Sequence, residues 1–290
     1  MNKKKIYPAY MIFLPLAVFS VFFLIPSTIG YFYSFTDWNP YVGKISFVGL
    51  ENFKDILSND ALMIAAENTI SFALIKTVMV TIIGIVFAML LNMNIKSRKI
   101  LRTVYFLPSV FSALIVGLVF AGLFDSNNGI INITLTNMGL DSWTQEWLGR
   151  RIPAMITVNL AEIWRSAGYG IVITLAALQA IPSDYLEAAT VDGASGWKKF
   201  RHIILPLIMP AVNVNILFSL IYGLKMFDLI YILTRGGPGH DTETFGTLIL
   251  NEMAKDRYAQ SVTINLVFSV LLIIVAISFQ KFSKWTEADI

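Results

Sequence analysis

Cysteine is absent from the 290 residues, which excludes disulfides, thiol catalysis, zinc ribbons and iron–sulfur ligation. Only two histidines are present, His202 and His240, so a histidine-rich metal site is excluded as well. Charged residues are scarce, at 14% of the chain compared with ~25% in soluble proteins. So few charges cannot cover a water-facing surface, and a net charge of +3 gives no basis for binding nucleic acid.

Motifs for nucleotide hydrolysis and for common hydrolases are also missing. The sequence contains no GxxxxGK[ST] phosphate loop, no GxSxG and no HExxH. We therefore expect no catalytic residues, no bound metal and no cofactor held by this chain. These absences favour a protein that is not an enzyme.

Long apolar runs dominate instead, with 56% hydrophobic residues. A membrane-spanning helix needs about 20 mainly apolar residues. The run that begins at Ile6 is too long for the apolar core of a cleaved signal peptide. The sequence predicts an all-α membrane protein with one transmembrane domain over 1–290. Its six predicted spans are about 8–34, 68–92, 103–124, 152–181, 205–233 and 258–280.

Lysine and arginine are unevenly distributed between the connections, and this predicts the orientation. One set flanks short segments and comprises Lys3, Lys4, Lys5, Lys96, Arg98, Lys99, Arg102, Lys198, Lys199, Arg201, Lys281 and Lys284. The smaller set is spread over longer segments and comprises Lys44, Lys54, Arg150, Arg151, Arg235, Lys255 and Arg257. Both termini are therefore predicted to be cytoplasmic, with segments 37–67, 125–151 and 234–257 outside.

The predicted cytoplasmic segment 182–202 contains signals for two short helices. Pro182 ends the incoming span, and Ser183 or Asp184 is a good N-cap. Gly193 suits the left-handed residue that follows a helix, and Ser195 can begin the second helix. Such a compact knob fits a groove on another protein. The same residues are equally consistent with an amphipathic connector that lies on the membrane surface.

The order of residues in this segment resembles a known signature. It reads Glu187-Ala188-Ala189, then Asp192-Gly193-Ala194, followed by Phe200, Ile203, Leu205-Pro206 and Pro210. This pattern resembles the cytoplasmic signature of permease subunits in binding-protein-dependent ABC importers. The resemblance favours a docking knob over a connector.

Other segments are similar to the maltose-type sugar permeases, in a compact six-span form. They are Gly49-Leu50-Glu51-Asn52-Phe53, Asn68-Thr69, Phe106-Leu107-Pro108, Gly129-Ile130-Ile131-Asn132, Thr234-Arg235-Gly236-Gly237-Pro238-Gly239 and Thr242-Glu243-Thr244. The chain lacks the extra N-terminal helices and large outer domain of the maltose prototype. Regulatory contacts specific to that prototype are therefore not expected.

The resemblance implies a division of labour in a bacterial plasma membrane. An extracytoplasmic binding protein delivers a sugar, and this chain forms a heterodimer with a second permease subunit. Two separate ATPase subunits bind ATP and Mg and drive import. The residues implied to couple this chain to the ATPase are Glu187, Ala188, Ala189, Asp192, Gly193 and Ala194.

Ionisable residues inside the predicted spans are candidate functional residues, because charges are costly in a bilayer. Glu162 and Arg165 are three residues apart on the fourth span, and Lys225 and Asp228 repeat this spacing on the fifth. Mutual neutralisation of each pair is the expectation. Lys76 has no partner nearby in sequence, and we expect a carboxylate from another span.

Polar residues at helical spacing predict a path for a sugar. Asn215, Ser219 and Tyr222 share one stripe on the fifth span. Further candidates are Asn159, Ser166 and Tyr169 on the fourth span, and Asn265 on the sixth. Small polar residues also join helices without touching substrate, so both roles stay open for each of them.

Three alternatives to sugar import remain on the sequence alone. In the first, the permease serves another polar solute. A self-sufficient ion-coupled carrier would use Glu162, Arg165, Lys225 and Asp228 as a relay. A membrane enzyme is the third alternative. The cytoplasmic signature separates the importer from the carrier, since a carrier that works alone needs no docking knob.

Overall fold

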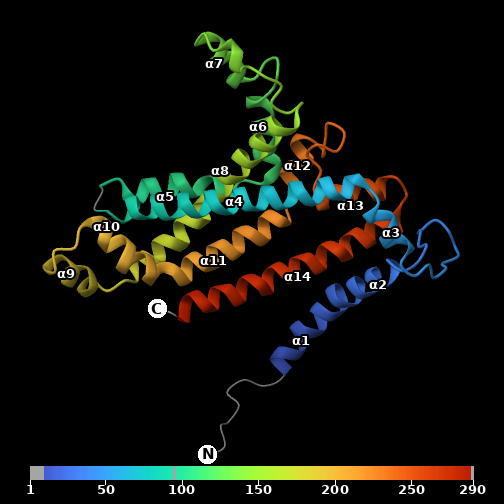
Figure 1. Ribbon diagram of the computed structural model, residues 1–290, viewed down its shortest axis with the longest axis horizontal. Helices are drawn as coiled ribbons and strands as arrows, with labels where there is room; N and C mark the ends of the chain where they lie inside the picture. The colour runs from blue at the N-terminus through green and yellow to red at the C-terminus, as the bar shows by residue number, and fades with distance from the viewer. Residues whose placement is uncertain (1–9, 94–95, 289–290) are drawn as a thin grey trace, which may run out of the picture. The chain divides into compact units, whose positions relative to one another are not determined.

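The computed structural model describes residues 10–93 and 96–288, and the regular elements in these ranges are helices joined by loops (Figure 1). Their β pairing is limited to a single antiparallel bridge, Thr36–Phe47. The sequence suggests one domain, whereas the chain packs as two compact units that we describe separately. The first unit comprises the residues up to Asp60 together with Ile249–Ser269. The second comprises Ala61–Leu248 and the residues from Val270 onward.

The helices follow one another with few long connections. The elements are α1 (Tyr10–Phe19), the π-helix η1 (Ser20–Leu24), α2 (Ile25–Tyr33), α3 (Glu51–Leu57), α4 (Asp60–Asn92), α5 (Arg98–Phe106), the 3₁₀-helix η2 (Leu107–Val110), α6 (Ala113–Leu123), α7 (Ile130–Asn137), the 3₁₀-helix η3 (Asp141–Trp143), α8 (Arg151–Gln179), α9 (Ser183–Val191), α10 (Gly196–Lys199), the π-helix η4 (Phe200–Ile204), α11 (Leu205–Leu224), α12 (Asp228–Leu233), α13 (Phe245–Ala254) and α14 (Tyr258–Ala288).

Four stretches are long and apolar enough to cross a membrane: Met11–Tyr33, Asp60–Asn92, Gly196–Leu224 and Tyr258–Ser283. Two bent pairs raise the number to six if each pair is one span. One pair joins α5 and η2 to α6 at 95°, and the other joins α8 to α9 at 70°. The predicted class, an all-α protein with several spans, is confirmed.

The predicted third span, 103–124, is broken rather than continuous. Its first part ends in η2, and Phe111 is extended before α6 begins. Ser112 caps α6, because its side chain accepts a hydrogen bond from the backbone nitrogen of Ile115 at 3.3 Å. The side-chain cap satisfies a backbone donor that a continuous helix would have paired internally. It therefore favours a new helix at this point.

The predicted fifth span, 205–233, differs at both ends. Its helix begins earlier, since α10, η4 and α11 form one helical stretch from Gly196. It ends at Leu224, and α12 begins only at Asp228. A basic residue, Lys225, stands at the end of α11, and an acidic residue stands at the start of α12. Both charges match the dipole of the helix end that they occupy, so they favour the break.

In the first unit, α3 is anchored to the end of α2 by Asn52. The buried Asn52 amide donates to the carbonyl oxygens of Ser34 and Thr36 at 2.9 and 2.8 Å. Thr263, in the first turns of α14, donates to the same Ser34 oxygen at 3.2 Å. Asn52, the asparagine of the Gly49–Phe53 motif, therefore anchors a loop.

In the second unit, α8 contributes to both apolar clusters. One cluster joins α4, α6, α8 and α12, and comprises Phe72, Val116, Val158, Ala161, Met226, Leu229, Ile230 and Leu233. The other joins α4, α8 and α11, and comprises Ala88, Leu91, Ile171, Leu175, Leu178, Ile208 and Val212. The helix α8 is therefore held along most of its length, and side chains on it have fixed positions.

Glycines let the backbones of this unit approach one another closely. A Cβ on Gly84 of α4 would lie 3.0 Å from the carbonyl carbon and oxygen of Gly170 on α8. A Cβ on Gly223 of α11 would lie 2.8 Å from the Cα of Ala73 on α4. Small residues at helix crossings are typical of membrane proteins, where packing rather than water drives association. The close crossings bring polar residues of α4, α8 and α11 together.

Candidate functional site

A buried cluster of three charges joins α4 to α8. Lys76 Nζ lies 2.9 Å from Glu162 Oε1, and Arg165 Nη2 lies 2.8 Å from Glu162 Oε2. Arg165 Nε donates a second bond to Oε2 at 2.9 Å. The predicted Glu162–Arg165 pair is confirmed, and the carboxylate expected for Lys76 is Glu162. The lysine and the glutamate are 1% and 0% exposed.

The cluster lies at one side of a cavity of about 460 Å³ formed by α4, η2, α8 and α11. The cavity is lined by Lys76, Ser109, Glu162, Arg165, Ser166, Tyr169, Ile173, Val214, Asn215, Phe218, Ser219 and Tyr222. The predicted stripe on α11 and most of the predicted stripe on α8 therefore meet at one place. Hydroxyl groups, an amide and two tyrosine rings are the groups that bind saccharides.

Asn215, Lys76 and Ser166 contribute different polar groups to the cavity wall. The Asn215 side chain is 3% exposed, and its amide nitrogen has no hydrogen-bond acceptor. A buried donor of this kind is costly unless a ligand or a partner satisfies it. Lys76 Nζ lies 5.0 Å from the centre of the Tyr222 ring, a cation–π contact that orients the ring. The Ser166 hydroxyl donates to the Glu162 carbonyl at 2.6 Å, so its oxygen can still accept a bond.

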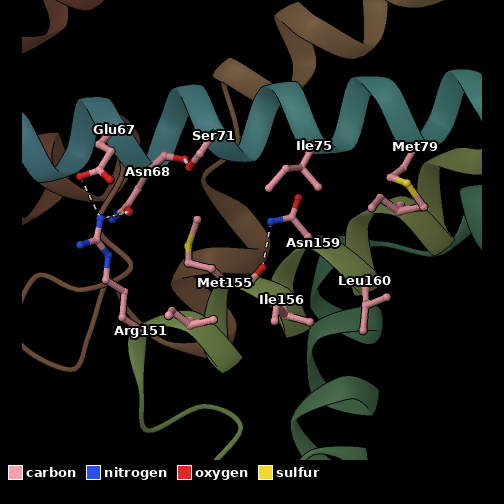
Figure 2. Close-up of a pocket in the computed structure, with 12 residues that line it drawn as sticks. Glu67, Asn68, Ser71, Ile75, Met79, Arg151, Met155, Ile156, Asn159 and Leu160 are labelled. Atoms are coloured by element: carbon pink, nitrogen blue, oxygen red, sulfur yellow. Dashed lines mark hydrogen bonds and ion pairs between the residues drawn. The ribbon is translucent and has the colours of Figure 1, made fainter.

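Asn159 lies outside this cavity, in an adjoining groove of about 610 Å³ between α4 and α8 (Figure 2). Its amide nitrogen donates to the Met155 carbonyl at 2.8 Å, and its buried Oδ1 has no partner. At one end of the groove, Arg151 contacts Glu67 at 3.0 Å and donates to Asn68 at 3.2 Å. Asn159 and the cavity stripe of α8 therefore occupy neighbouring hollows.

Three other predicted residues are not among those that line the cavity. Asn265 is exposed on α14 and is not among the residues that line the cavity. Lys225 and Asp228 are both exposed, and the described residues show no ion pair between them. The predicted Lys225–Asp228 pair is therefore wrong. The helix break places them at a helix end and at a helix start, where three-residue spacing no longer defines a shared face.

The signature segment forms the predicted knob, with α9 ending at a left-handed Gly193, φ 72°. The backbone nitrogen of Ala194 donates to the Ala189 carbonyl at 2.9 Å, and that of Gly193 donates to the Thr190 carbonyl at 3.1 Å. These two bonds are the Schellman motif, which requires a residue that tolerates positive φ. The glycine of the signature thus has a direct structural reason.

The ends of the two knob helices are partly as predicted. Ser195 caps α10 as expected, because its hydroxyl oxygen accepts from the Lys198 backbone nitrogen at 3.4 Å. Neither Ser183 nor Asp184 caps α9, since the cap position is Pro182 and no side-chain bond is made there. The ring of proline fixes a backbone angle that already suits the turn into the helix.

The knob exposes apolar side chains on its outer side. Val191 is 88% exposed and Trp197 is 67% exposed. Glu187 and Asp192 are also exposed. The Lys199 ammonium donates to the Thr190 hydroxyl at 2.7 Å and ties the second helix to the first. Such a rigid, partly apolar surface suits contact with another protein.

The 234–244 loop is held in place by residues of the motifs that are similar to those of sugar permeases. The Thr242 hydroxyl donates to Thr234 Oγ1 at 2.7 Å and to the Gly237 carbonyl at 2.8 Å. The Asn68 amide donates to the carbonyl oxygens of Asp241 and Glu243, each at 2.9 Å. The motif asparagine and threonines therefore hold this loop against the start of α4.

Asn132 has the same role in the 126–147 segment. Its amide donates to the carbonyl oxygens of Ser126 and Gln145 at 3.0 Å each, and its Oδ1 accepts from the Trp147 indole at 2.8 Å. Gly129 is required because a Cβ there would lie 2.3 Å from the Asp125 carbonyl oxygen. An asparagine after a turn glycine was the sequence signal for this anchor.

The helical architecture, the polar cavity and the exposed two-helix knob occur together in a chain whose sequence matches a family of transport proteins. The family model for the binding-protein-dependent transport system inner membrane component matches residues 80–286. The chain belongs to this family, and it is a multi-pass protein of the plasma membrane.

Curated relatives cover nearly the whole chain. The trehalose/maltose transport system permease protein MalF of Thermococcus litoralis is 31% identical, over 95% of this chain and 93% of its own. The multiple sugar-binding transport system permease protein MsmF of Streptococcus mutans is 32% identical, over 94% and 93%. The probable starch degradation products transport system permease protein AmyD of Thermoanaerobacterium thermosulfurigenes is 31% identical, over 89% and 88%.

Solved structures share the fold. A crystal structure of a bacterial ABC transporter involved in the import of the acidic polysaccharide alginate superposes with a TM-score of 0.83, at 23% identity, over 95% of this chain and 94% of that chain. The same transporter type in complex with an alginate pentasaccharide-bound periplasmic protein gives 0.83 at 23% identity, over 96% and 94%. The chain therefore has the fold of an ABC importer permease.

Proposed function

We propose that this chain is the sugar-translocating permease subunit of an ATP-driven importer. The observation that carries the proposal is the cavity, in which polar residues of α8 and α11 meet. Serine hydroxyls in the lining offer hydrogen bonds to sugar hydroxyls. Tyr169 and Tyr222 are about half exposed and offer flat ring faces. The names of the relatives, which mention trehalose, maltose, multiple sugars and starch products, support a saccharide.

Membership of the family supports the partners that we propose for this chain. An extracytoplasmic binding protein delivers the sugar, and a second permease subunit supplies the remaining wall of the path. Two ATPase subunits bind ATP and Mg, since this chain contains no phosphate loop. Glu187–Ala194 docks on an ATPase subunit, and both termini lie in the cytoplasm.

The knob is linked mechanically to the cavity. The helical stretch that begins at Gly196 continues without interruption to Leu224 and includes Asn215 and Ser219. On its other side, α9 follows α8 after a bend of 70°. A displacement of the knob by an ATPase subunit is therefore transmitted to both helices that form the cavity wall. This arrangement couples ATP hydrolysis to exposure of the sugar.

The cavity is tested by uptake of labelled mono-, di- and trisaccharides into cells with the complete importer. Asn215→Ala and Ser219→Ala should reduce uptake at least ~10-fold, the effect of losing about 1.4 kcal/mol of binding. Thr103→Ala, an exposed position outside the cavity, serves as the control. Membrane abundance is measured in parallel. Unchanged uptake in both cavity variants would reject the cavity as the sugar path.

Coupling is tested with two glycines that both have open space around a substituent. Gly193 has a positive φ and Gly196 does not. Gly193→Val should displace the knob, because left-handed geometry costs a branched residue ~1–2 kcal/mol or more. We expect normal insertion but weak ATPase co-purification or ATP hydrolysis without uptake. Gly196→Val should keep uptake. Normal uptake in Gly193→Val and in Glu187→Ala would mean that the segment is an ordinary connector.

Orientation is tested with single cysteines, which is simple in a chain without native cysteine. An impermeant maleimide should label Asn59→Cys and Asn137→Cys in intact cells. Ser195→Cys should react only after the membrane is opened. Labelling of Ser195→Cys from outside would reverse the proposed orientation.

A further inference from the structure

The charges that line the cavity do not balance. Its ionisable side chains other than tyrosine are Lys76, Arg165 and Glu162. Two are cationic and one is anionic, and Glu162 is the single carboxylate in the lining. Both of its oxygens are already occupied, Oε1 by the lysine and Oε2 by the arginine. The part of the lining that this chain supplies therefore carries one positive charge in excess.

The excess charge faces the cavity through Arg165. Lys76 and Glu162 are almost fully buried, whereas the Arg165 side chain is 17% exposed. Its Nε and Nη2 both contact Glu162 Oε2, and Arg165 is one of the residues that line the cavity. A guanidinium keeps its charge in proteins and binds carboxylates well. Charge interactions are stronger here than in water, because the surroundings have a low dielectric constant.

The size of the excess charge indicates which anionic group fits. Asn215 lines the same cavity as Arg165, so the lining combines a cation with polar groups that suit a sugar. A carboxylate carries one charge, which matches the excess, whereas a phosphate monoester carries about 1.5–2.

We propose that the cavity selects saccharides that carry a carboxylate, as uronate residues do, and that Arg165 determines this selectivity. This inference rests on the proposed function, in which the cavity is the sugar path. A neutral sugar could use the same hydroxyl-binding groups but would leave the excess charge without a counter-ion.

The test measures binding to the purified importer in nanodiscs, without its binding protein, so that the permease alone sets the selectivity. The probes are oligosaccharides in matched pairs with a C6 carboxylate or a C6 hydroxyl. The acidic member should bind at least ~10-fold more tightly than the neutral member. Most of this ratio should persist at ~1 M salt, because buried charges are screened much less than exposed ones.

Variants of Arg165 identify the residue responsible. Arg165→Gln leaves the Lys76–Glu162 pair intact, so no buried charge loses its partner, and it should reduce the acid-to-neutral ratio to about one. Arg165→Lys keeps the charge and should keep most of the preference. Arg150→Gln removes a cation outside the cavity and should change nothing.

Two results would overturn the proposal. Equal affinity for both members of every pair in the unmodified protein would exclude charge selection. An equal loss of both affinities in Arg165→Gln would show that the arginine binds hydroxyl groups instead. Failure of the underlying function is a different result: no pair would bind, and Asn215→Ala would leave uptake unchanged.

Discussion

Two sites in the sequence have the same spacing of opposite charges but form different structures. Glu162 and Arg165 lie in the middle of the uninterrupted helix α8 and form a buried cluster with Lys76. Lys225 and Asp228 stand on either side of the break between α11 and α12 and are exposed. Three-residue spacing defines a shared face only where the helix is continuous.

The difference also has an energetic side. Lys76 and Glu162 are almost fully shielded from water, so each needs an opposite charge beside it. At the break, each charge matches the dipole of its own helix end and remains accessible. Charges of the first kind are required for folding and available for ligand selection. Charges of the second kind mark where the helix ends.

The largest loss of stability is expected when the carboxylate of Glu162, which Lys76 and Arg165 share, is removed. Glu162→Leu leaves Lys76 buried without a partner, and breaking a buried pair in this way costs ~3–5 kcal/mol. We expect a large loss of membrane abundance and a lower midpoint of thermal unfolding for the purified importer. Asp228→Leu, the corresponding change at the break, is the matched control. Similar losses in both variants would show that the buried and the exposed charges contribute equally to stability.

A second change disturbs the helix crossing that places the cluster. Gly223→Val puts a side chain against the backbone of Ala73, three residues before Lys76 on α4. Overpacking of this kind costs about 1–3 kcal/mol. Gly122→Val on α6 is the control, because a substituent there meets open space. Thermal unfolding should separate the two variants, and equal midpoints would show that the crossing is not tight.

The smallest effect is expected at the helix break. Lys225→Met and Asp228→Leu should each change the free energy of unfolding by no more than ~0.5 kcal/mol, as exposed substitutions usually do. The double variant should equal the sum of the two single changes. A double-mutant cycle with a coupling energy above ~1 kcal/mol would restore the pair that the sequence suggested.

Much of this could be predicted from the sequence, since the relevant signals are local. The apolar runs predict the helices, Gly193 predicts the end of α9, and Ser195 predicts the start of α10. The stripe Asn215, Ser219 and Tyr222 predicts a shared face because α11 is continuous there. These features depend on neighbouring residues along one helix.

The remaining features depend on how helices cross or break. The partner of Lys76 is set by the α4–α8 crossing, which sequence spacing does not encode. Asn159 shares the spacing of the α8 stripe, but it lines the separate groove together with residues of α4. The two breaks did have local signals: Ser112 as a cap, and a basic residue followed by an acidic one at Lys225 and Asp228. Because the surrounding residues are mostly apolar, both segments resemble continuous spans in spite of these signals.

The most direct test of the sugar path uses the absence of native cysteine. Ser166→Cys places a thiol in the cavity, and Ser71→Cys places one in the neighbouring groove. Both are reacted with a small water-soluble thiol reagent in the assembled importer, with and without the saccharide that the cells take up. We expect the saccharide to slow the modification of Ser166→Cys and to leave the rate of modification of Ser71→Cys unchanged. Equal modification of Ser166→Cys with and without the saccharide would contradict this expectation.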